Sequence, residues 1–174
     1  EQVDNLFDTA FGTYGSVDIA FNNAGISPPD DDSIETTEID AWDRVQQVNL
    51  TSVYLCSRAA LRHMVAQQRG SIINTASFVA VPGGGAPPIS HTAAEGGGFS
   101  LTPRPVNTPL LQELFAKDPE RAQRRLVHVP VGRFAQPEEL AAAVAFLASD
   151  DASFITASTF LVDGGISSAY VTPL

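Results

Sequence analysis

Small and polar residues follow three short apolar segments of the chain, at positions where side chains could take part in chemistry. Residues 22–25 (NNAG) follow the first apolar run, Ser77 ends the second, and residues 163–165 (DGG) follow the third. If these runs are parallel strands, their carboxyl ends meet at the edge where α/β proteins bind ligands. A serine hydroxyl both donates and accepts a hydrogen bond, so Ser77 could contact a ligand at that edge.

A histidine and a glutamate stand four residues apart in another candidate segment. Histidine is the residue type that ordinarily changes its charge near neutral pH, so His91 could give or take a proton. Glu95 lies about one helical turn further on and could orient the imidazole. An ordinary ion pair on a helix surface is an equally good interpretation of this spacing.

The acidic balance of the chain argues against nucleic acid as a partner. Twenty acidic and ten basic residues give a net charge of −10, whereas a protein that binds the phosphate backbone needs the opposite sign. The densest acidic run, residues 30–32, follows two prolines. Such a run indicates an exposed loop rather than a cation site, and we expect no metal.

Cysteine use and hydropathy bear on where the protein works. Cys56 is the only cysteine, which excludes an intrachain disulfide and a cysteine-rich metal site and favours a reducing compartment. No apolar run approaches the ~20 residues of a membrane span, and no signal peptide opens the chain. We therefore expect a cytoplasmic protein with no membrane partner.

Strand-like and helix-like segments alternate along the chain. Apolar residues recur every three or four positions in the helix-like segments, whereas residues 17–23 form a short apolar run typical of a strand buried on both faces of a parallel sheet. The predicted strands are 17–23, 71–77 and 154–162, and the predicted helices are 1–11, 39–68 and 137–149. This alternation predicts a doubly wound parallel α/β sheet. The length of the chain predicts that residues 1–174 form a single domain.

The order of the motifs resembles the short-chain dehydrogenase/reductase family. The segments that carry this resemblance have the family's order and spacing along nearly the whole chain: residues 22–25 (NNAG), Asn49, Ser77, residues 105–108 (PVNT) and residues 160–165 (FLVDGG). Residues 132–134 (GRF) before residues 137–139 (PEE) are similar to the 3-oxoacyl-carrier-protein reductase group.

This resemblance implies a Rossmann-like sheet and an NAD- or NADP-dependent oxidoreductase. Such an enzyme transfers hydride between the nicotinamide and a small-molecule carbonyl compound or secondary alcohol, with a 3-oxoacyl thioester as one candidate. It also implies a homotetramer formed through the long helix and the final strand, with the apolar residues 166–174 covered by a neighbour. Residues 109–125 suit a mobile lid over the substrate, although a surface helix is nearly as good an interpretation.

The resemblance assigns roles to individual residues. Ser77 matches the serine that binds the substrate oxygen, and Asn49 matches the asparagine that holds a proton-relay water. The positions that match cofactor contacts are Asn23, Ala24 and Gly25 on the adenosine side, and Val106 and Thr108 at the nicotinamide.

Two positions depart from the family pattern. Relatives carry a tyrosine as the proton donor and, four residues later, a lysine that lowers the tyrosine pKa and binds the cofactor ribose. This chain has His91 and Glu95 there, and a carboxylate can do neither of the lysine's tasks. The alternative function is therefore a non-catalytic, dinucleotide-binding pseudoenzyme or scaffold.

The surroundings of that motif are also unusual. Glycine runs at residues 83–85 and 96–98 flank it, and each glycine inside a helix is destabilising by roughly 1 kcal/mol relative to alanine. About twenty residues that the family places between Thr102 and Pro103 are absent, as is a first strand with a glycine-rich phosphate loop. The resemblance therefore implies that residues 1–174 form a partial Rossmann-like domain.

Three explanations fit these departures. In the first, the sequence lacks residues of its parent protein and carries wrong residues at the motif, where the parent would have tyrosine at position 91; in the second, the gene has decayed; in the third, the chain was cut deliberately. We favour the first explanation, which predicts a chain break between Thr102 and Pro103 and strand neighbours on only one side of strand 17–23.

Overall fold

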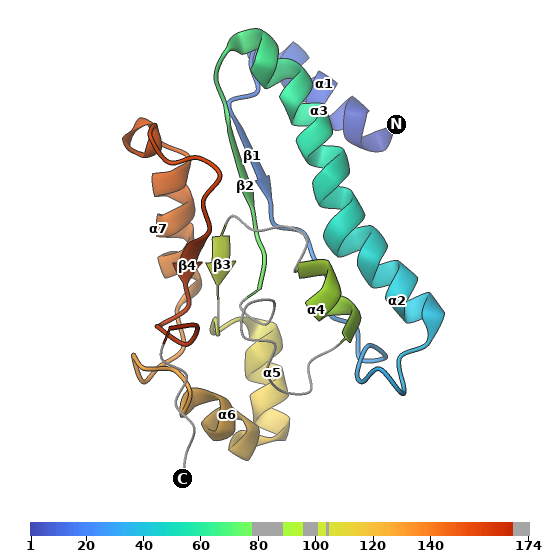
Figure 1. Cartoon of the computed structure of the whole chain (residues 1–174), viewed down its shortest axis with the longest axis vertical. Helices are drawn as coiled ribbons and strands as arrows, with labels where there is room; N and C mark the ends of the chain where they lie inside the picture. Colours follow the sequence, from blue (N-terminus) through green and yellow to red (C-terminus); the bar gives the residue numbers. More distant parts are fainter. Residues whose placement is uncertain (78–88, 96–100, 104, 169–174) are drawn as a thin grey trace.

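Parallel strands form the centre of this α/β protein (Figure 1). The computed structural model describes residues 1–77, 89–95, 101–103 and 105–168. Strand β1 (Ile19–Asn22) pairs in parallel with β2 (Ser71–Asn74), and β3 (Leu101–Pro103) pairs in parallel with β4 (Phe160–Val162). A parallel bridge between Thr75 and Leu101 joins the two pairs, and the Ala76 N–H donates to the Leu101 carbonyl at 2.8 Å.

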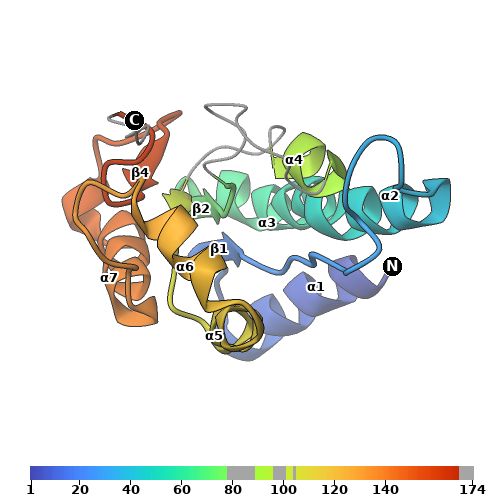
Figure 2. The same cartoon turned by 90° about the horizontal axis from the view of Figure 1, so that it is seen from below.

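Helices lie on both sides of these strands, as a doubly wound sheet requires. Helices α1 (Gln2–Tyr14), α3 (Ser52–Gln67) and α4 (Ile89–Glu95) lie on one side, and α7 (Pro137–Leu147) lies on the other (Figures 1 and 2). Helices α5 (Pro109–Lys117) and α6 (Pro119–Leu126) lie beyond the carboxyl ends of the strands (Figure 1). The predicted fold class is confirmed, and the strands are shorter than the sequence predicted.

Strand β1 is buried on one face only, so the prediction of a strand buried on both faces is wrong. Ala20 packs with Ala60 and Met64 of α3 in the core cluster. Ile19 and Phe21, whose side chains alternate with that of Ala20, are 50% and 42% exposed. Among the described residues β1 pairs with β2 alone, which confirms the prediction that its strand neighbours lie on one side.

The long helix predicted over residues 39–68 is interrupted. It consists of α2 (Ile39–Val45), a π-helical segment η1 (Gln46–Thr51) and α3. A π turn adds one residue to the helical ring, and such turns are frequent at functional sites. Here η1 contains Asn49, which is buried.

Strand β3 runs through the junction at which a chain break was predicted. Thr102 pairs with Leu161 and Pro103 pairs with Val162 in consecutive register, so the predicted break is wrong. Thr102 is fully buried, and this junction therefore forms part of the core of the sheet. Both glycine runs that flank the His91 motif, residues 83–85 and 96–98, lie outside the described residues.

The segment from residue 109 to 125 is two helices rather than one, because α5 ends before Asp118 and α6 begins at Pro119. Phe115 of α5 stacks on Phe134 with ring centroids 5.2 Å apart. In the carboxyl-terminal tail, Ile166 is buried within this chain, which contradicts the expectation that a neighbour covers it, and residues 169–174 lie outside the described part. No described helix is long and apolar enough to cross a membrane.

Candidate active site

Asn49 joins the loop after β1 to the long helix. Its Oδ1 accepts a hydrogen bond from the Ile26 N–H at 2.8 Å, and its Nδ2 donates to the Ile26 carbonyl at 2.9 Å. Both backbone groups of Ile26 are therefore satisfied by one side chain that lies 23 residues further along the chain. The η1 turn holds Asn49 in the position that makes this pairing possible.

The same amide nitrogen reaches the imidazole of His91. Asn49 Nδ2 lies 3.3 Å from His91 Nδ1, and α4 packs against both η1 and α2. Two site residues predicted from the sequence are therefore in direct contact, although 42 positions separate them. His91 is half-buried.

Asp31 holds the first turn of α4. Its Oδ1 accepts from the Ser90 N–H and its Oδ2 accepts from the His91 N–H, each at 3.0 Å. Asp31 is 3% exposed, so the expectation that residues 30–32 form an exposed loop is wrong at this position. Sequence reasoning missed Asp31, because its partners lie about 60 residues away and no local pattern marks them.

Ser77 and Glu95 complete the predicted catalytic set. Ser77 follows β2 by three residues and is buried. Glu95 is the last residue of α4. The proximity of Ser77 to His91 stays a prediction. The catalytic roles of Ser77 and Glu95 also stay predictions.

The residues predicted to face the adenosine form the loop after β1. Asn23, Ala24 and Gly25 are exposed, and Asn23 Oδ1 accepts from the Thr75 hydroxyl at 3.0 Å. This bond links the loop after β1 to the residue that follows β2. A Cβ at Gly25 would lie 3.5 Å from Asn49 Oδ1, which is ordinary contact, so packing alone does not require glycine there.

The residues predicted to hold the nicotinamide lie in a loop tied to a second segment. Val106 forms a parallel bridge with Ala135, and the Asn107 N–H donates to the Ala135 carbonyl at 2.8 Å. The Thr108 hydroxyl accepts from the Leu111 N–H at 3.4 Å in the first turn of α5. The cofactor loop and the start of α5 are therefore held together.

The two loops fit the neutral parts of a dinucleotide. Residues 22–26 and 105–108 offer main-chain groups, amides and a hydroxyl, and they contain no basic side chain. Such a donor set suits a nucleoside and a carboxamide better than a pyrophosphate.

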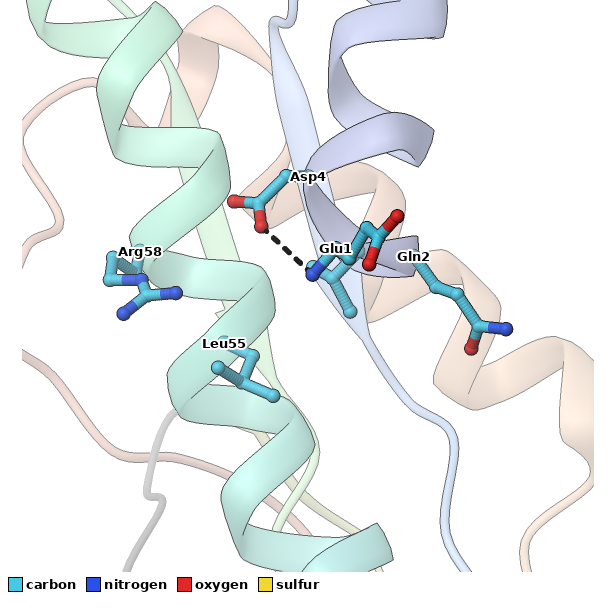
Figure 3. Close-up of a pocket in the computed structure, with 6 residues that line it drawn as sticks. Glu1, Gln2, Asp4, Leu55 and Arg58 are labelled. Carbon is cyan, nitrogen blue, oxygen red and sulfur yellow. Dashed lines mark ion pairs between the residues drawn. The ribbon is translucent and has the colours of Figure 1, made fainter.

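The structure also contains surface hollows away from these loops. One has a volume of about 330 Å³ and lies between α1 and α3 (Figure 3), and another of about 350 Å³ lies beside Gly70. In the first, the Glu1 α-amino group pairs with Asp4 at 3.2 Å (Figure 3). None of the predicted site residues lines either hollow.

The described residues contain no group of three or more His, Cys, Asp or Glu side chains arranged to hold a metal ion. Asp30, next to the buried Asp31, pairs instead with Arg44 at 2.7 Å. The hydrogen bond from Arg44 lowers the pKa of Asp30. Burial raises the pKa of the Cys56 thiol, which disfavours the nucleophilic thiolate.

Two protein-family models match this chain. Residues 1–95 match the family model described as short chain dehydrogenase, and residues 99–167 match the model described as enoyl-(acyl carrier protein) reductase. Together the two matches cover most of the chain.

Several characterised proteins are similar over nearly the whole chain. A cis-4-hydroxycyclohexanecarboxylate dehydrogenase of Sinomonas cyclohexanicum is 37% identical, over 95% of this chain and 72% of its own length. A 3beta-hydroxysteroid dehydrogenase 1 of Eggerthella lenta is 39% identical, over 95% of this chain and 69% of its own. A Xanthobacter autotrophicus protein named inactive 2-(S)-hydroxypropyl-CoM dehydrogenase 2 is 37% identical, over 83% and 71%.

The fold comparison agrees with the sequence comparisons. The crystal structure of levodione reductase superimposes with a TM-score of 0.88 and 30% identity, over 97% of this chain and 74% of that one. The chain therefore belongs to the short-chain dehydrogenase/reductase family of NAD(P)-dependent oxidoreductases, which transfer hydride between a nicotinamide cofactor and an alcohol or carbonyl compound.

Proposed function

We propose that this chain reduces a small ketone, or oxidises the matching secondary alcohol, with His91 serving the substrate oxygen in place of the family's tyrosine. The observation that carries the proposal is the contact between Asn49 Nδ2 and His91 Nδ1 at 3.3 Å. It gives the imidazole a defined orientation at the site where the resemblance places the proton donor.

The contact also selects one tautomer of His91. The Ile26 N–H needs an acceptor and the Ile26 carbonyl needs a donor, so Asn49 presents its oxygen to the former and its nitrogen to the latter. The second hydrogen on Asn49 Nδ2 then points to His91 Nδ1, which must accept it. A neutral imidazole that accepts at Nδ1 carries its proton on Nε2.

This tautomer suits the reduction of a carbonyl group. The Nε2–H donates a hydrogen bond to the substrate oxygen, as neutral imidazoles do in other enzymes that polarise a carbonyl. The same hydrogen bond would stabilise the negative charge that develops on the substrate oxygen during reduction. Solvent water would supply the proton that turns this oxygen into a hydroxyl, so the imidazole stays neutral. Asn49 thus acts on His91 directly rather than through a relay water, because both of its amide hydrogens are engaged.

The remaining roles follow the resemblance. The Ser77 hydroxyl donates a second hydrogen bond to the substrate oxygen. A bound NAD or NADP supplies the hydride. Val106 and Thr108 hold the nicotinamide, while Asn23, Ala24 and Gly25 line the adenosine side. Helices α5 and α6 cover the substrate as a lid, and residues 1–174 form one domain.

A non-catalytic protein that binds a dinucleotide is the second candidate. Glu95 supports it, because a carboxylate stands where the family has a lysine cation, and one similar protein is named as an inactive dehydrogenase. In this case the cofactor would bind without turnover.

A kinetic comparison separates the two candidates. Wild type, H91A and the double variant H91Y/E95K are each assayed by the absorbance of NADH and NADPH with a panel of ketones, cyclic alcohols and 3-oxoacyl thioesters. Turnover by wild type that exceeds that of H91A at least tenfold supports the proposal. Cofactor binding with no turnover in wild type, together with turnover in H91Y/E95K, supports the pseudoenzyme instead.

The homotetramer is proposed on the surface of α3. Tyr54, Leu61 and Val65 repeat at helical spacing and are 60%, 47% and 62% exposed, so they form an apolar stripe that a second copy would cover. Light scattering on wild type and L61E tests this: the variant is expected to shift to a smaller species, and an unchanged mass would contradict the interface. The cytoplasm is the proposed location, because a lone cysteine favours a reducing compartment.

A further inference from the structure

Asp31 is a buried carboxylate whose neighbours in the same acidic run are not buried. Asp30 is exposed and pairs with Arg44, and Asp32 is exposed. Asp31 alone points inward, with 3% of its surface exposed, and bonds to α4. The three consecutive acids therefore have different tasks.

A buried carboxylate is destabilising unless its charge is compensated. No ion pair within the described part of the chain involves Asp31; its compensation is the pair of N–H groups of Ser90 and His91, both at 3.0 Å. These amides lie in the first turn of α4 and have no acceptor within the helix. The positive end of the helix dipole favours the same negative charge, and hydrogen bonds to an ionised acceptor are the strong ones.

The opposite side of this turn is held by η1. Gln46 Nε2 donates to the Ser90 carbonyl at 2.9 Å, and Asn49 contacts the His91 ring. Residues 90 and 91 are thus fixed from two elements, the acidic loop and the π-helical segment. Loss of the Asp31 side of this arrangement would let the backbone of His91 shift while Asn49 stays bound to Ile26.

We propose that Asp31 is a positioning residue for His91. Its carboxylate fixes the backbone at residues 90 and 91, so that the imidazole reaches Asn49 and holds the Nε2–H tautomer. The consequence for turnover rests on the proposed function, but the effect on ring and backbone does not. A misplacement of about 1 Å at a reacting group can lower a rate by about 100-fold.

The structural test compares D31A and D31N with the matched control D32A. Amide hydrogen exchange at residues 90 and 91 is expected to accelerate at least tenfold in D31A and to stay within twofold of wild type in D32A. D31N keeps the size of the side chain and one acceptor, so it is expected to fold and to accelerate mainly one of the two amides. Unchanged exchange at both residues, or an equal acceleration across α1, α3 and α7, would overturn the proposal.

The tautomer of the His91 imidazole is a second measurement, because it would not change if Asp31 only stabilised the helix. The 15N chemical shifts of the His91 imidazole at neutral pH are expected to report a protonated Nε2 in wild type and D32A, and a mixture of tautomers in D31A and D31N. Faster amide exchange with wild-type ring shifts would mean that Asp31 supports only the helix, and would overturn the positioning role.

Kinetics distinguish failure of this inference from failure of the proposed function. If wild type turns over, D31N is expected to lower kcat at least tenfold with the KM for the cofactor within twofold, and an unchanged kcat would contradict the inference. If wild type has no turnover, the proposed function fails, and the exchange and ring measurements still decide the role of Asp31.

Discussion

The side chain of Asn49 pairs with both backbone polar groups of Ile26, at 2.8 Å to the N–H and 2.9 Å to the carbonyl. Asn49 is buried, and Ile26 is half-buried beside it. At Ile26, the loop that follows β1 is therefore held by a side chain of η1.

Replacement of Asn49 by alanine should destabilise the fold. The N–H and carbonyl of Ile26 would lose their partners, and each buried group left unpaired costs about 1–3 kcal/mol. Because Ile26 is half-buried, water compensates in part, and we expect the free energy of unfolding to fall by about 2 kcal/mol in total. Urea denaturation of N49A measures this, with Q47A as the control, because Gln47 is an exposed residue of the same η1 segment. Equal midpoints for the two variants would contradict the assignment.

Local patterns in the sequence predict the elements well and their long-range contacts poorly. The helical spacing in residues 137–149 and the apolar run at residues 71–77 correspond to α7 and β2. The interruption of the long helix at η1 was not predicted, because a π turn changes the hydrogen-bond pattern without removing the apolar periodicity.

The position of Asp31 illustrates the same limit for the candidate site. Three consecutive acids have the composition of a solvated loop, and the sequence carries no sign that the middle one faces inward. Its burial follows from two amides about 60 residues later. Asn49 was assigned a role only through the resemblance to a family, and its contact with His91 lies beyond any local pattern.

Ser77 provides a kinetic prediction. If its hydroxyl binds the substrate oxygen, S77A should lower kcat by about 100-fold, which is the usual effect of removing one donor to a developing oxyanion. The affinity for NADH or NADPH should stay within twofold, because the hydroxyl addresses the substrate. Steady-state kinetics and cofactor titration measure both quantities. S158A is the control, since Ser158 is exposed and donates to the carbonyl of Thr156. Equal kcat values in the two variants would remove Ser77 from the mechanism.

Gly70, between α3 and β2, should not tolerate a side chain. It has φ = 149°, and a Cβ there would lie 2.4 Å from Met64 Cγ and 2.5 Å from Met64 Sδ. Since Met64 belongs to the core cluster, G70A should lower the free energy of unfolding by about 2–4 kcal/mol through strain and overpacking.

The matched control for G70A is a glycine in open space. Gly12 lies inside α1 and has nothing within 4 Å of a Cβ. G12A should raise the free energy of unfolding by about 0.5–1 kcal/mol, because alanine is the better helix former. Opposite shifts in the thermal midpoints of G70A and G12A are expected, and shifts of the same sign would contradict this account of the turn.

The ion pair between Arg133 and Glu139 should make stability depend on pH in the acid range. Two hydrogen bonds of 2.7 and 2.8 Å join the side chains, and the Gln136 N–H donates to Glu139 Oε2 at 2.8 Å. The bonds from Arg133, followed by that from Gln136, lower the pKa of Glu139 from 4.5 to about 2. The folded state therefore holds the carboxylate charged at pH values where the unfolded chain protonates it.

The direction of the effect follows from this lowered pKa. The contribution of Glu139 to stability is fully present above pH 4.5 and is lost as the pH falls toward 2. E139Q should therefore be less stable than wild type near neutral pH, and the difference should shrink between pH 4.5 and pH 2. Urea denaturation of both proteins at pH 7, 5, 4 and 3 measures it. E138Q is the control, because Glu138 is exposed in the same turn of α7. A difference that stays constant down to pH 3 would show that the effect of E139Q does not arise from the charge at residue 139.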